Sequence, residues 1–365
     1  MAVTLTINNR KIIASEGDTV LEAARGAGIK IPTLCHHPDL SNVGACRLCV
    51  VSVEKARTLQ TACTTPIVEG MVVDTESAAA RETRRFVLEM LLSDHPNDCM
   101  KCESDGDCEL QDLAYEYDVS WPAYSGAHHT YEPDPDPNPF VSIDRNKCIL
   151  CGRCLRACAE IQVRNVWSFA GRGFNSKLVA GADQPMLEAR CESCGQCVAY
   201  CPVGALYDKL SLKQARANKV KKVRTTCPYC GVGCSMDLNV RDGRIVRATS
   251  NPEAPVNGMA LCVKGRYGYD FVHHADRLTK PKVRRYLLEG GKKNKGKNCD
   301  EWVDVDWDVA LDITARKLRD IRDESGSDSV GVLTSAKCLN EENYLMNKFA
   351  RQVIGTNNID HCARL

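Results

Sequence analysis

The sequence predicts a chain of several small α+β domains, and three observations indicate this fold class. The length of 365 residues allows two to four domains. Short strand patterns and helix patterns alternate along the chain and are separated by turn signals. The 22 cysteines gather in tight groups, a density typical of disulfide scaffolds or of proteins that bind metal through thiolates.

The composition excludes two classes of partner. The 48 basic and 47 acidic side chains nearly cancel, so the chain has no overall basic field for nucleic acid. No run approaches the roughly 18 consecutive apolar residues that a membrane span requires. The first residues lack the pattern of a signal peptide, so we expect a cytoplasmic protein. In a reducing cytosol the thiols serve a purpose other than disulfides.

The first third of the chain opens with a strand, strand, helix pattern. Residues 4–7 and 11–14 flank Asn8-Asn9 and predict a β-hairpin, and residues 19–28 predict a short helix. Residues 78–92 predict an amphipathic helix. We expect its apolar stripe to consist of Val87, Leu88, Met90 and Leu91, and its solvent face to carry Arg81, Arg84 and Arg85.

The rest of the chain contains two junctions and two further elements. Four prolines in residues 133–139 predict an extended linker, and the basic residues 219–224 predict a solvated crossing between domains. Residues 236–249 predict a hairpin around an Asp-Gly turn. Near the end we expect a buried strand at residues 329–334, a helix at 341–353 and, at 356–360, the approach to another strand, as in the opening βα unit of a larger parallel sheet.

The strongest signal is a duplicated run with the spacing C-x2-C-x2-C-x3-C, the only clear internal repeat. In such a run, three cysteines wrap one [4Fe-4S] cube and the fourth reaches the other cube. The second run ends in the Cys-Pro of bacterial ferredoxins, whereas the first ends in Cys-Ala. The two expected ligand sets are Cys148, Cys151, Cys154 and Cys201, and Cys191, Cys194, Cys197 and Cys158.

A second group, after the β-rich start, has one long loop and a distant fourth cysteine. This spacing is of the same order as in plant-type ferredoxins and predicts a [2Fe-2S] centre. A structural zinc site is the alternative. His36 and His37 lack the arrangement of a Rieske centre, so we expect them at the surface or beside the ligands. The expected ligands are Cys35, Cys46, Cys49 and Cys63.

Two more groups complete the count of metal sites. His95, Cys99, Cys102 and Cys108 follow the amphipathic helix and predict a [4Fe-4S] cluster with one histidine, or else a zinc site. A neutral imidazole in place of a thiolate would raise the reduction potential of such a cluster.

The other group predicts a further [4Fe-4S] cluster, held by Cys227, Cys230, Cys234 and Cys262. Gly231 and Gly233 would let the backbone fold closely around the cube. Three cysteines remain, and we expect them to be small buried residues or inert thiols: Cys299, Cys338 and Cys362.

At this point the sequence resembles a known family over its whole length. The [2Fe-2S] group, the group with His95 and the duplicated run are similar to modules shared by the large subunit of respiratory NADH dehydrogenase, iron-only hydrogenases and NAD-linked formate dehydrogenases. Residues 227–234 and 257–266 instead resemble the entrance of molybdopterin-dependent oxidoreductases, formate dehydrogenase above all. Residues 340–344 and 355–365 resemble formate dehydrogenase more narrowly.

The resemblance implies a fold and a set of domain boundaries. In order, we expect a β-grasp [2Fe-2S] ferredoxin-like domain, a helical [4Fe-4S] domain with one His and three Cys ligands, a linker, a bacterial 2[4Fe-4S] ferredoxin domain, a small molybdopterin-oxidoreductase [4Fe-4S] domain, and the incomplete start of the molybdopterin α/β domain. Their boundaries are 1–78, 79–121, 122–140, 141–218, 219–280 and 281–365.

The function implied is that of the N-terminal part of the catalytic α subunit of a cytoplasmic formate dehydrogenase, linked to NAD(P) or ferredoxin. The full-length enzyme would hold molybdenum or tungsten in a bis-molybdopterin guanine dinucleotide. Flavin- and iron–sulfur-containing NAD(P)-reducing subunits, or hydrogenase subunits, would complete a hetero-oligomer. Lys264 would lie between the Cys227 cluster and the pterin and help carry electrons across.

In that family a catalytic cysteine or selenocysteine follows the stretch that matches residues 360–365. The resemblance therefore implies that the catalytic residue comes at the position after Leu365 and that none lies within the chain. Position 366 is expected to be selenocysteine encoded by UGA; a natural short subunit is the rival interpretation.

Two other functions remain open. One is a stand-alone electron-transfer subunit serving a separate hydrogenase, formate dehydrogenase or NADH dehydrogenase chain. The other is a zinc-rich structural or regulatory protein.

Overall fold

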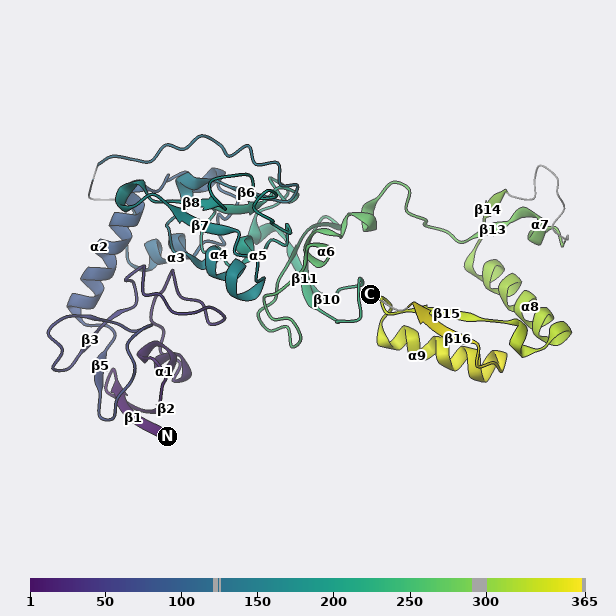
Figure 1. Cartoon of the computed structure of the whole chain (residues 1–365), viewed down its shortest axis with the longest axis horizontal. Coiled ribbons are helices and arrows are strands. Elements are labelled where there is room, and N and C mark those ends of the chain that lie inside the picture. Colours follow the sequence, from purple (N-terminus) through teal and green to yellow (C-terminus); the bar gives the residue numbers. More distant parts are fainter. Residues whose placement is uncertain (121–123, 125, 291–300, 363–365) are drawn as a thin grey trace. The chain divides into compact units, whose positions relative to one another are not determined.

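The computed structural model describes residues 1–120, 124, 126–290 and 301–362 (Figure 1). The lysine-rich segment 291–297 and Cys299 lie outside the described residues. So does Leu365, and the catalytic position expected after it stays a prediction. The chain forms two compact units that alternate along the sequence. Unit 1 consists of residues 1–223, 237–253 and 258–267, and unit 2 consists of residues 224–236, 254–257 and 268–365.

Unit 1 begins with a five-stranded mixed sheet and one helix, α1 (Val20–Gly26). The hairpin predicted at the start is confirmed, because β1 pairs antiparallel with β2 and Asn8 and Asn9 have positive φ. Thr19 caps α1, since its hydroxyl accepts from the Glu22 N–H at 3.3 Å. The strands, in sheet order, are β2 (Arg10–Ser15), β1 (Ala2–Ile7), β5 (Val72–Asp74), β3 (Val50–Val53) and β4 (Gln60–Thr61).

The helix predicted from residue 78 is present as α2 (Ala78–Asp94), but the expected position of Arg84 is wrong. Arg84 is fully buried, with 0% exposure. Its guanidinium donates to the Val50 carbonyl oxygen at 2.8 Å, the Leu48 carbonyl oxygen at 3.2 Å and the Tyr117 hydroxyl at 3.0 Å. These buried acceptors require a donor, and helical periodicity cannot reveal them. A short turn, η1 (Cys99–Lys101), and helix α3 (Glu109–Glu116) follow.

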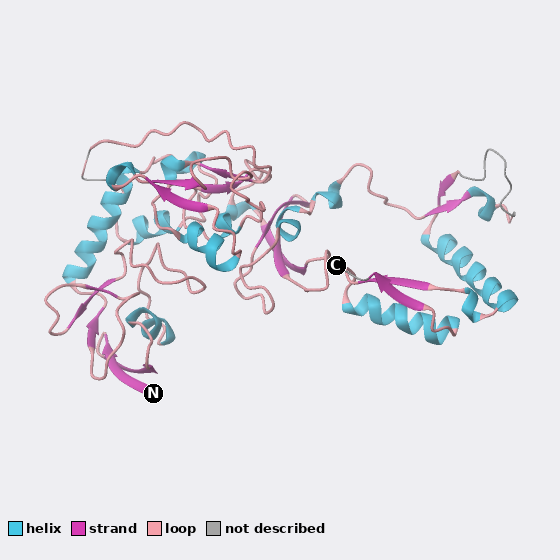
Figure 2. Ribbon diagram, viewed as in Figure 1, coloured by secondary structure: helices cyan, strands magenta, loops and turns pink. Residues whose placement is uncertain are grey.

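The proline-rich segment has no helix or strand, as predicted, but it is not a free spacer (Figure 2). Asn138 is 1% exposed. The Lys209 ammonium donates to the carbonyl oxygens of Asp136 at 2.7 Å and Asn138 at 2.6 Å. These buried backbone groups therefore fasten the end of the segment to the domain that follows it.

The duplicated cysteine runs share one local structure. In each run a glycine in the left-handed conformation precedes a short helix, with φ of 70° at Gly152 and 73° at Gly195. The helices are α4 (Arg153–Arg156), which continues as the wider turn η3 (Ala157–Ile161), and α5 (Gln196–Ala199). Around them lie η2 (Arg145–Lys147), η4 (Gly173–Asn175) and two antiparallel pairs: β6 (Val141–Ile143) with β9 (Leu206–Asp208), and β7 (Trp167–Ala170) with β8 (Lys177–Ala180).

The predicted Asp-Gly hairpin is confirmed. β11 (Ser235–Arg241) pairs antiparallel with β12 (Arg244–Thr249), and Asp237 faces Thr249 in this register. A short helix, α6 (Val263–Tyr267), completes unit 1. The basic junction follows the turn η5 (Ala217–Lys219) and forms a largely exposed strand, β10 (Lys221–Thr226), in which the chain passes from unit 1 to unit 2.

Unit 2 ends in the parallel strand–helix–strand arrangement that the sequence predicts. β15 (Val332–Ser335) pairs in parallel with β16 (Ile359–Cys362), and helix α9 (Asn340–Lys348) continues as η8 (Phe349–Ile354) between them. The sequence reasoning missed the helix α8 (Trp307–Ser325). The smaller elements are η6 (Asp270–His273), β13 (Lys282–Arg284), α7 (Arg285–Leu288), β14 (Trp302–Asp304) and η7 (Ser327–Ser329). Within the described ranges, no helix has the length and apolar character to cross a membrane.

Candidate iron–sulfur sites

The four cysteines of the first group meet beside the N-terminal sheet. The Sγ atoms of Cys49 and Cys63 are 3.4 Å apart, and the Cys46 N–H donates to Cys35 Sγ at 3.4 Å. The Leu34 N–H donates to Cys46 Sγ at 3.4 Å. A hydrogen bond from the Cys46 thiol lowers the pKa of Cys35 to about 6. The loop thus supplies paired sulfurs and N–H donors that stabilise thiolate.

The two histidines beside this group are not surface residues. His36 is 5% exposed, and burial lowers its pKa to about 4, so its imidazole is neutral. His37 is partly buried, and its ring packs edge-on against Tyr200 with centroids 4.6 Å apart. The expectation that they lie at the surface is therefore wrong, whereas a place beside the ligands agrees with the structure.

His95 has the hydrogen bonding of a metal-binding imidazole. It ends helix α2, and its Nδ1 lies 3.0 Å from the Pro96 carbonyl oxygen. Its Nε2 is buried and has no hydrogen-bond partner among the described residues. Burial also lowers the pKa of His95, which favours the neutral ring. Metal-binding histidines commonly donate one N–H to a carbonyl and use the other nitrogen as the ligand.

The three cysteines of the same group differ in exposure. Cys99 is exposed, Cys102 is half-buried, and Cys108 precedes helix α3, where burial raises the pKa of its thiol to about 11. A β-carbon added at Gly204 would overlap Cys102 Sγ. Only glycine therefore permits the ferredoxin segment to pass this close to the sulfur.

The eight cysteines of the duplicated runs line two separate cavities. Each cavity takes three cysteines from one run and the last cysteine of the other run, which is the exchange that the spacing predicts. The first holds Cys148, Cys151, Cys154 and Cys201, and the second holds Cys158, Cys191, Cys194 and Cys197.

The cysteines of both cavities are buried thiols that backbone N–H groups approach. Burial raises the pKa of Cys148 to about 11 and that of Cys151 to about 12, and it also raises the pKa of Cys191. Two of the N–H contacts lie in the second cavity. The Ser193 N–H donates to Cys191 Sγ at 3.3 Å, and the Val166 N–H donates to Cys158 Sγ at 3.4 Å.

These donor sets fit iron–sulfur clusters. No group of three or more His, Cys, Asp or Glu side chains within the described part of the chain could hold a metal ion. The cysteines around a cluster bind different iron atoms, so their sulfurs need not converge on one point. A cavity that all four cysteines line is therefore the better criterion for a cluster site. Buried thiols around an enclosed space, with N–H donors and an unpaired imidazole nitrogen, are what such clusters require.

The fifth group is divided between the two units. Cys227, Cys230 and Cys234 belong to unit 2, where the Cys227 N–H donates to the Cys234 carbonyl oxygen at 2.8 Å and closes their loop. Cys262 and Lys264 belong to unit 1, and both are exposed.

Gly231, in the same loop, is close to another part of unit 2, and its predicted approach to a cube stays a prediction. A β-carbon there would lie 2.9 Å from the Ala336 carbonyl oxygen. The close approach is thus to the turn after β15, within unit 2. Of the leftover cysteines, Cys338 is half-buried. Cys362 is exposed, so the expectation of a small buried residue is wrong for it; a hydrogen bond with Ser335, 3.1 Å between Sγ and Oγ, lowers its pKa.

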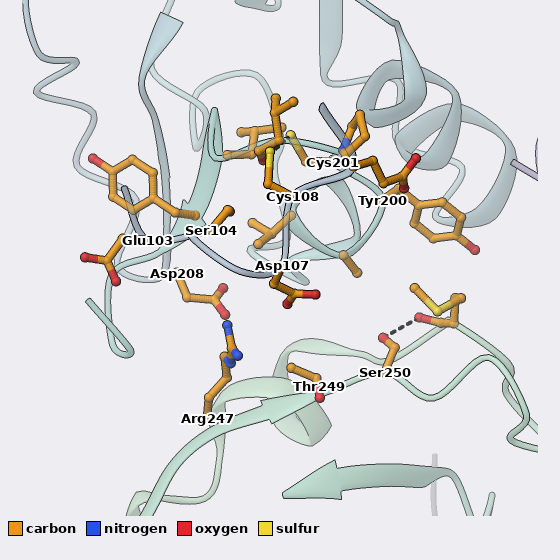
Figure 3. A pocket seen from close by; sticks show the side chains of 18 of the residues that line it. Glu103, Ser104, Asp107, Cys108, Tyr200, Cys201, Asp208, Arg247, Thr249 and Ser250 are labelled. Atoms are coloured by element: carbon orange, nitrogen blue, oxygen red, sulfur yellow. Dashed lines mark hydrogen bonds between the residues drawn. The ribbon is translucent and has the colours of Figure 1, made fainter. Parts of the chain in front are cut away.

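Three of the cysteine groups pack against one apolar core. The core includes Leu34, Leu48, Leu110 and Val203, and the cysteines packed on it are Cys46, Cys108, Cys148 and Cys201. Figure 3 shows Cys108 and Cys201 together at one wall of a cavity of about 430 Å³. The Glu109 N–H donates to the Pro202 carbonyl oxygen at 2.9 Å and joins the two segments.

The sequence reasoning missed the buried polar side chains beside the cysteines. Arg156 donates from Nη2 to the Cys35 carbonyl oxygen at 2.5 Å and to the Cys151 carbonyl oxygen at 3.4 Å, so it joins two of the groups. Arg153, Gln196 and Arg266 are likewise buried. In the sequence, the only sign of their burial is that they lie inside or just after cysteine motifs.

Comparison with protein families identifies five consecutive domains. The matched descriptions are a 2Fe-2S iron–sulfur cluster binding domain (residues 1–78), the NADH-ubiquinone oxidoreductase-G iron–sulfur binding region (84–121), the ferredoxin-like domain of NADH-quinone oxidoreductase subunit 3 (138–207), a molybdopterin oxidoreductase Fe4S4 domain (220–274) and molybdopterin oxidoreductase (277–365).

Relatives span the chain but are longer. The α subunit of a NADPH-Fe(3+) oxidoreductase from Geobacter sulfurreducens is 35% identical over 100% of this chain and 40% of its own length. The G 2 polypeptide of the NADH-quinone oxidoreductase of Rhizobium meliloti is 34% identical over 99% of this chain and 40% of its own length. A Staphylococcus aureus protein with the provisional name of a formate dehydrogenase is 30% identical over 99% of this chain and 39% of its own length.

The chain therefore spans about 40% of the length of these relatives. A chain in the crystal structure of an NAD+-reducing [NiFe]-hydrogenase is 36% identical, with a TM-score of 0.51, over 57% of this chain and 87% of that chain. The predicted fold class of 2Fe-2S, 4Fe-4S and molybdopterin-oxidoreductase domains is thus confirmed. In this chain, iron–sulfur domains of the NADH-quinone oxidoreductase type precede two molybdopterin oxidoreductase domains.

Proposed function

We propose that the chain is the N-terminal iron–sulfur portion of a formate dehydrogenase catalytic subunit. It carries electrons between a molybdenum or tungsten bis-pterin site, where formate and CO2 interconvert, and a flavin or iron–sulfur partner that reduces NAD(P) or ferredoxin. The observation that carries the proposal is the domain order, because the Fe4S4 and molybdopterin oxidoreductase domains directly follow the cluster domains of the NADH-quinone oxidoreductase type. The provisional name of the Staphylococcus aureus relative favours formate as substrate.

We assign the clusters to the five ligand groups of the sequence. Cys35, Cys46, Cys49 and Cys63 hold [2Fe-2S], and the other four groups hold [4Fe-4S]. One two-iron and four four-iron centres require about eighteen iron atoms per chain. The free Nε2 of His95 and the two cysteine-lined cavities support these sets.

The bound clusters supply one-electron redox chemistry, and the residues of this chain hold them and control their surroundings. An apolar core packs against cysteines of three groups, Cys46, Cys108, Cys148 and Cys201. N–H donors to Cys191 and Cys158 favour the more negative state of the cluster they hold. The exposed Lys264 is the residue we assign to electron passage toward the pterin. The partners would be NAD(P)-reducing or hydrogenase subunits in a cytoplasmic hetero-oligomer.

The test uses the full-length enzyme purified without oxygen. Iron, acid-labile sulfide, molybdenum, tungsten and pterin are measured first, and formate is then added while cluster absorbance is followed. We expect about eighteen iron for the groups of this chain, one metal-bound pterin pair, and bleaching of the clusters by formate. A pterin-loaded enzyme whose clusters are reduced by NADH or NADPH but never by formate would contradict the assignment of substrate.

A second function is a cluster subunit that serves a separate hydrogenase or NADH dehydrogenase chain. The likeness to a chain of the NAD+-reducing [NiFe]-hydrogenase favours it. This alternative predicts the same iron content but neither pterin nor molybdenum or tungsten in the full-length product.

The family resemblance also predicts a catalytic cysteine or selenocysteine at the position after Leu365. This stays a prediction, because the end of the chain lies outside the described residues. The next codon and an intact mass test it directly.

A further inference from the structure

The position between the second and third cysteines of each duplicated run carries a buried polar side chain. It is Arg153 in the first run and Gln196 in the second, with exposures of 3% and 1%. Each follows a left-handed glycine and starts a short helix. The two side chains differ in charge and shape, yet each has one nitrogen that is buried and has no hydrogen-bond partner among the described residues, Nε of Arg153 and Nε2 of Gln196.

The outer end of each side chain is held by a residue next to another ligand group. Arg153 donates from Nη1 and Nη2 to the two carboxylate oxygens of Glu109, at 2.6 Å and 2.8 Å. Glu109 directly follows Cys108. Because this bidentate pair uses both terminal nitrogens, only Nε is left unpaired.

Gln196 is also held at its outer end, by Arg266 and by the backbone of Leu261. Its Oε1 accepts from Arg266 Nη2 at 2.8 Å and lies 3.4 Å from the Leu261 backbone nitrogen. Both neighbours can only donate, so the orientation of the amide is fixed by chemistry and Nε2 must face away from them. Arg266 lies four residues after Cys262 and also donates from Nε to the Cys194 carbonyl oxygen at 3.0 Å.

The free amide nitrogen belongs to a side chain that lines the second cysteine cavity. A buried N–H without an acceptor costs about 1–3 kcal/mol, so native proteins rarely leave one unmatched. One cysteine of this cavity already accepts from another amide: Asn138 Nδ2 lies 3.6 Å from Cys191 Sγ. A cluster in this cavity would bring sulfur acceptors to the wall that Gln196 lines.

We propose that Gln196 donates its Nε2–H to a sulfur of the cluster held by Cys191, Cys194, Cys197 and Cys158, and that Arg266 is the positioning residue that fixes this donor. The proposal rests on the ligand sets of the proposed function. A hydrogen bond to cluster sulfur stabilises the reduced, more negative state and raises the reduction potential. At the same position of the first run, Arg153 is held by Glu109 and likewise has a buried nitrogen without a partner among the described residues.

The experiment is a redox titration of the full-length holoenzyme with dithionite, in which electron paramagnetic resonance follows each reduced cluster. Gln196→Glu keeps the oxygen that Arg266 holds and removes the amide donor, and Gln196→Leu removes the donor without adding charge. We expect both to lower the midpoint potential of one and the same [4Fe-4S] signal, Gln196→Glu by more. Gln214→Leu changes an exposed glutamine of the same unit and should shift no signal.

Two further readouts separate a donor from a packing role. An exchangeable proton should couple magnetically to that cluster in H2O, disappear in D2O, and be missing in Gln196→Leu. Arg266→Lys keeps the charge but loses the planar fork, so it should lower the same potential by less than Gln196→Glu.

Iron content is measured first, and the variants that keep full iron decide. An unchanged potential in them, or an unchanged proton coupling, overturns the proposal. Loss of four iron atoms in all three variants at positions 196 and 266 would show a structural role only and would also overturn it. If the unaltered enzyme lacks [4Fe-4S] iron, the proposed function fails instead, so the two failures are distinguishable.

Discussion

At the scale of single residues, the functional information lies in nitrogen atoms without partners. His95 Nε2 and Gln196 Nε2 are both buried and both lack a partner among the described residues. We propose that the first donates its lone pair to iron and that the second donates its N–H to sulfur. Cysteine spacing alone locates neither property, because it says nothing about what surrounds the sulfurs.

The clearest residue-scale prediction concerns His95. We expect His95→Ala to lose one cube, or about four of eighteen iron atoms, since no described side chain occupies its Nε2. His95→Cys should keep the cube at a lower reduction potential, because a thiolate adds negative charge. Iron analysis and a redox titration of the full-length enzyme measure both effects.

His128→Ala is the matched control, since His128 is exposed. It should change neither iron content nor potential. A full complement of iron in His95→Ala, with all cluster signals unchanged, would exclude His95 as a ligand.

At the scale of elements, the duplicated turns before α4 and α5 share a backbone conformation but differ in how closely other side chains approach the glycine. Gly152 and Gly195 share a left-handed backbone. A β-carbon at Gly152 would have its nearest neighbour, a Phe169 ring atom, at 3.8 Å. At Gly195 it would overlap both Tyr267 Oη and Arg266 Cδ. In the first turn, glycine is therefore required only by the backbone conformation. In the second turn, it is also required because a β-carbon would not fit.

This difference predicts unequal effects of the same substitution. Gly152→Ala should cost about 1–2 kcal/mol, the usual penalty of a left-handed alanine, and keep its iron. Gly195→Ala should cost more and displace the side chains of Arg266 and Tyr267 from their contacts with this turn. Thermal unfolding and iron content of the two variants, compared side by side, test the prediction; equal losses would contradict it.

At the scale of the whole molecule, the cysteines are part of the cores of unit 1. Three apolar cores of unit 1 include or contact cysteines from each of the first four groups. The buried apolar side chains of the strand–helix–strand part of unit 2 include no predicted cluster ligand; they are Val330, Val332, Ala350 and Ile354. Stability should therefore depend on bound iron far more in unit 1.

Removal of iron tests this difference in the full-length protein. After chelation under oxidising conditions, amide hydrogen exchange should speed up across residues 84–120 and 138–207, because thiols must then fill the cluster space. Residues 332–362 should exchange as before. Uniform loss of protection in both regions, or none in either, would contradict the prediction.

Much of this architecture could be predicted from the sequence because its determinants are local. The hairpins at Asn8-Asn9 and Asp242-Gly243 depend on turn chemistry, and the exchanged cysteine of each run depends on spacing. The failures are non-local. Arg84 is buried because Leu48 and Val50 offer carbonyl oxygens, residues 136–138 are held by Lys209, and the orientation of Gln196 depends on Arg266. None of these partners is close in sequence.

The exposure of Cys99 has a consequence for the life of the protein in air. Oxygen and peroxide attack clusters and thiolates that solvent can reach, and Cys99 is exposed while Cys108 of the same group packs on the core shared with Cys46, Cys148 and Cys201. Oxidative damage that starts at this rim would therefore open the core under two neighbouring groups. We expect air to damage the cluster of the Cys99 group first and the clusters of the groups that share its core afterwards. The packing of the cysteines then determines the order in which clusters decay.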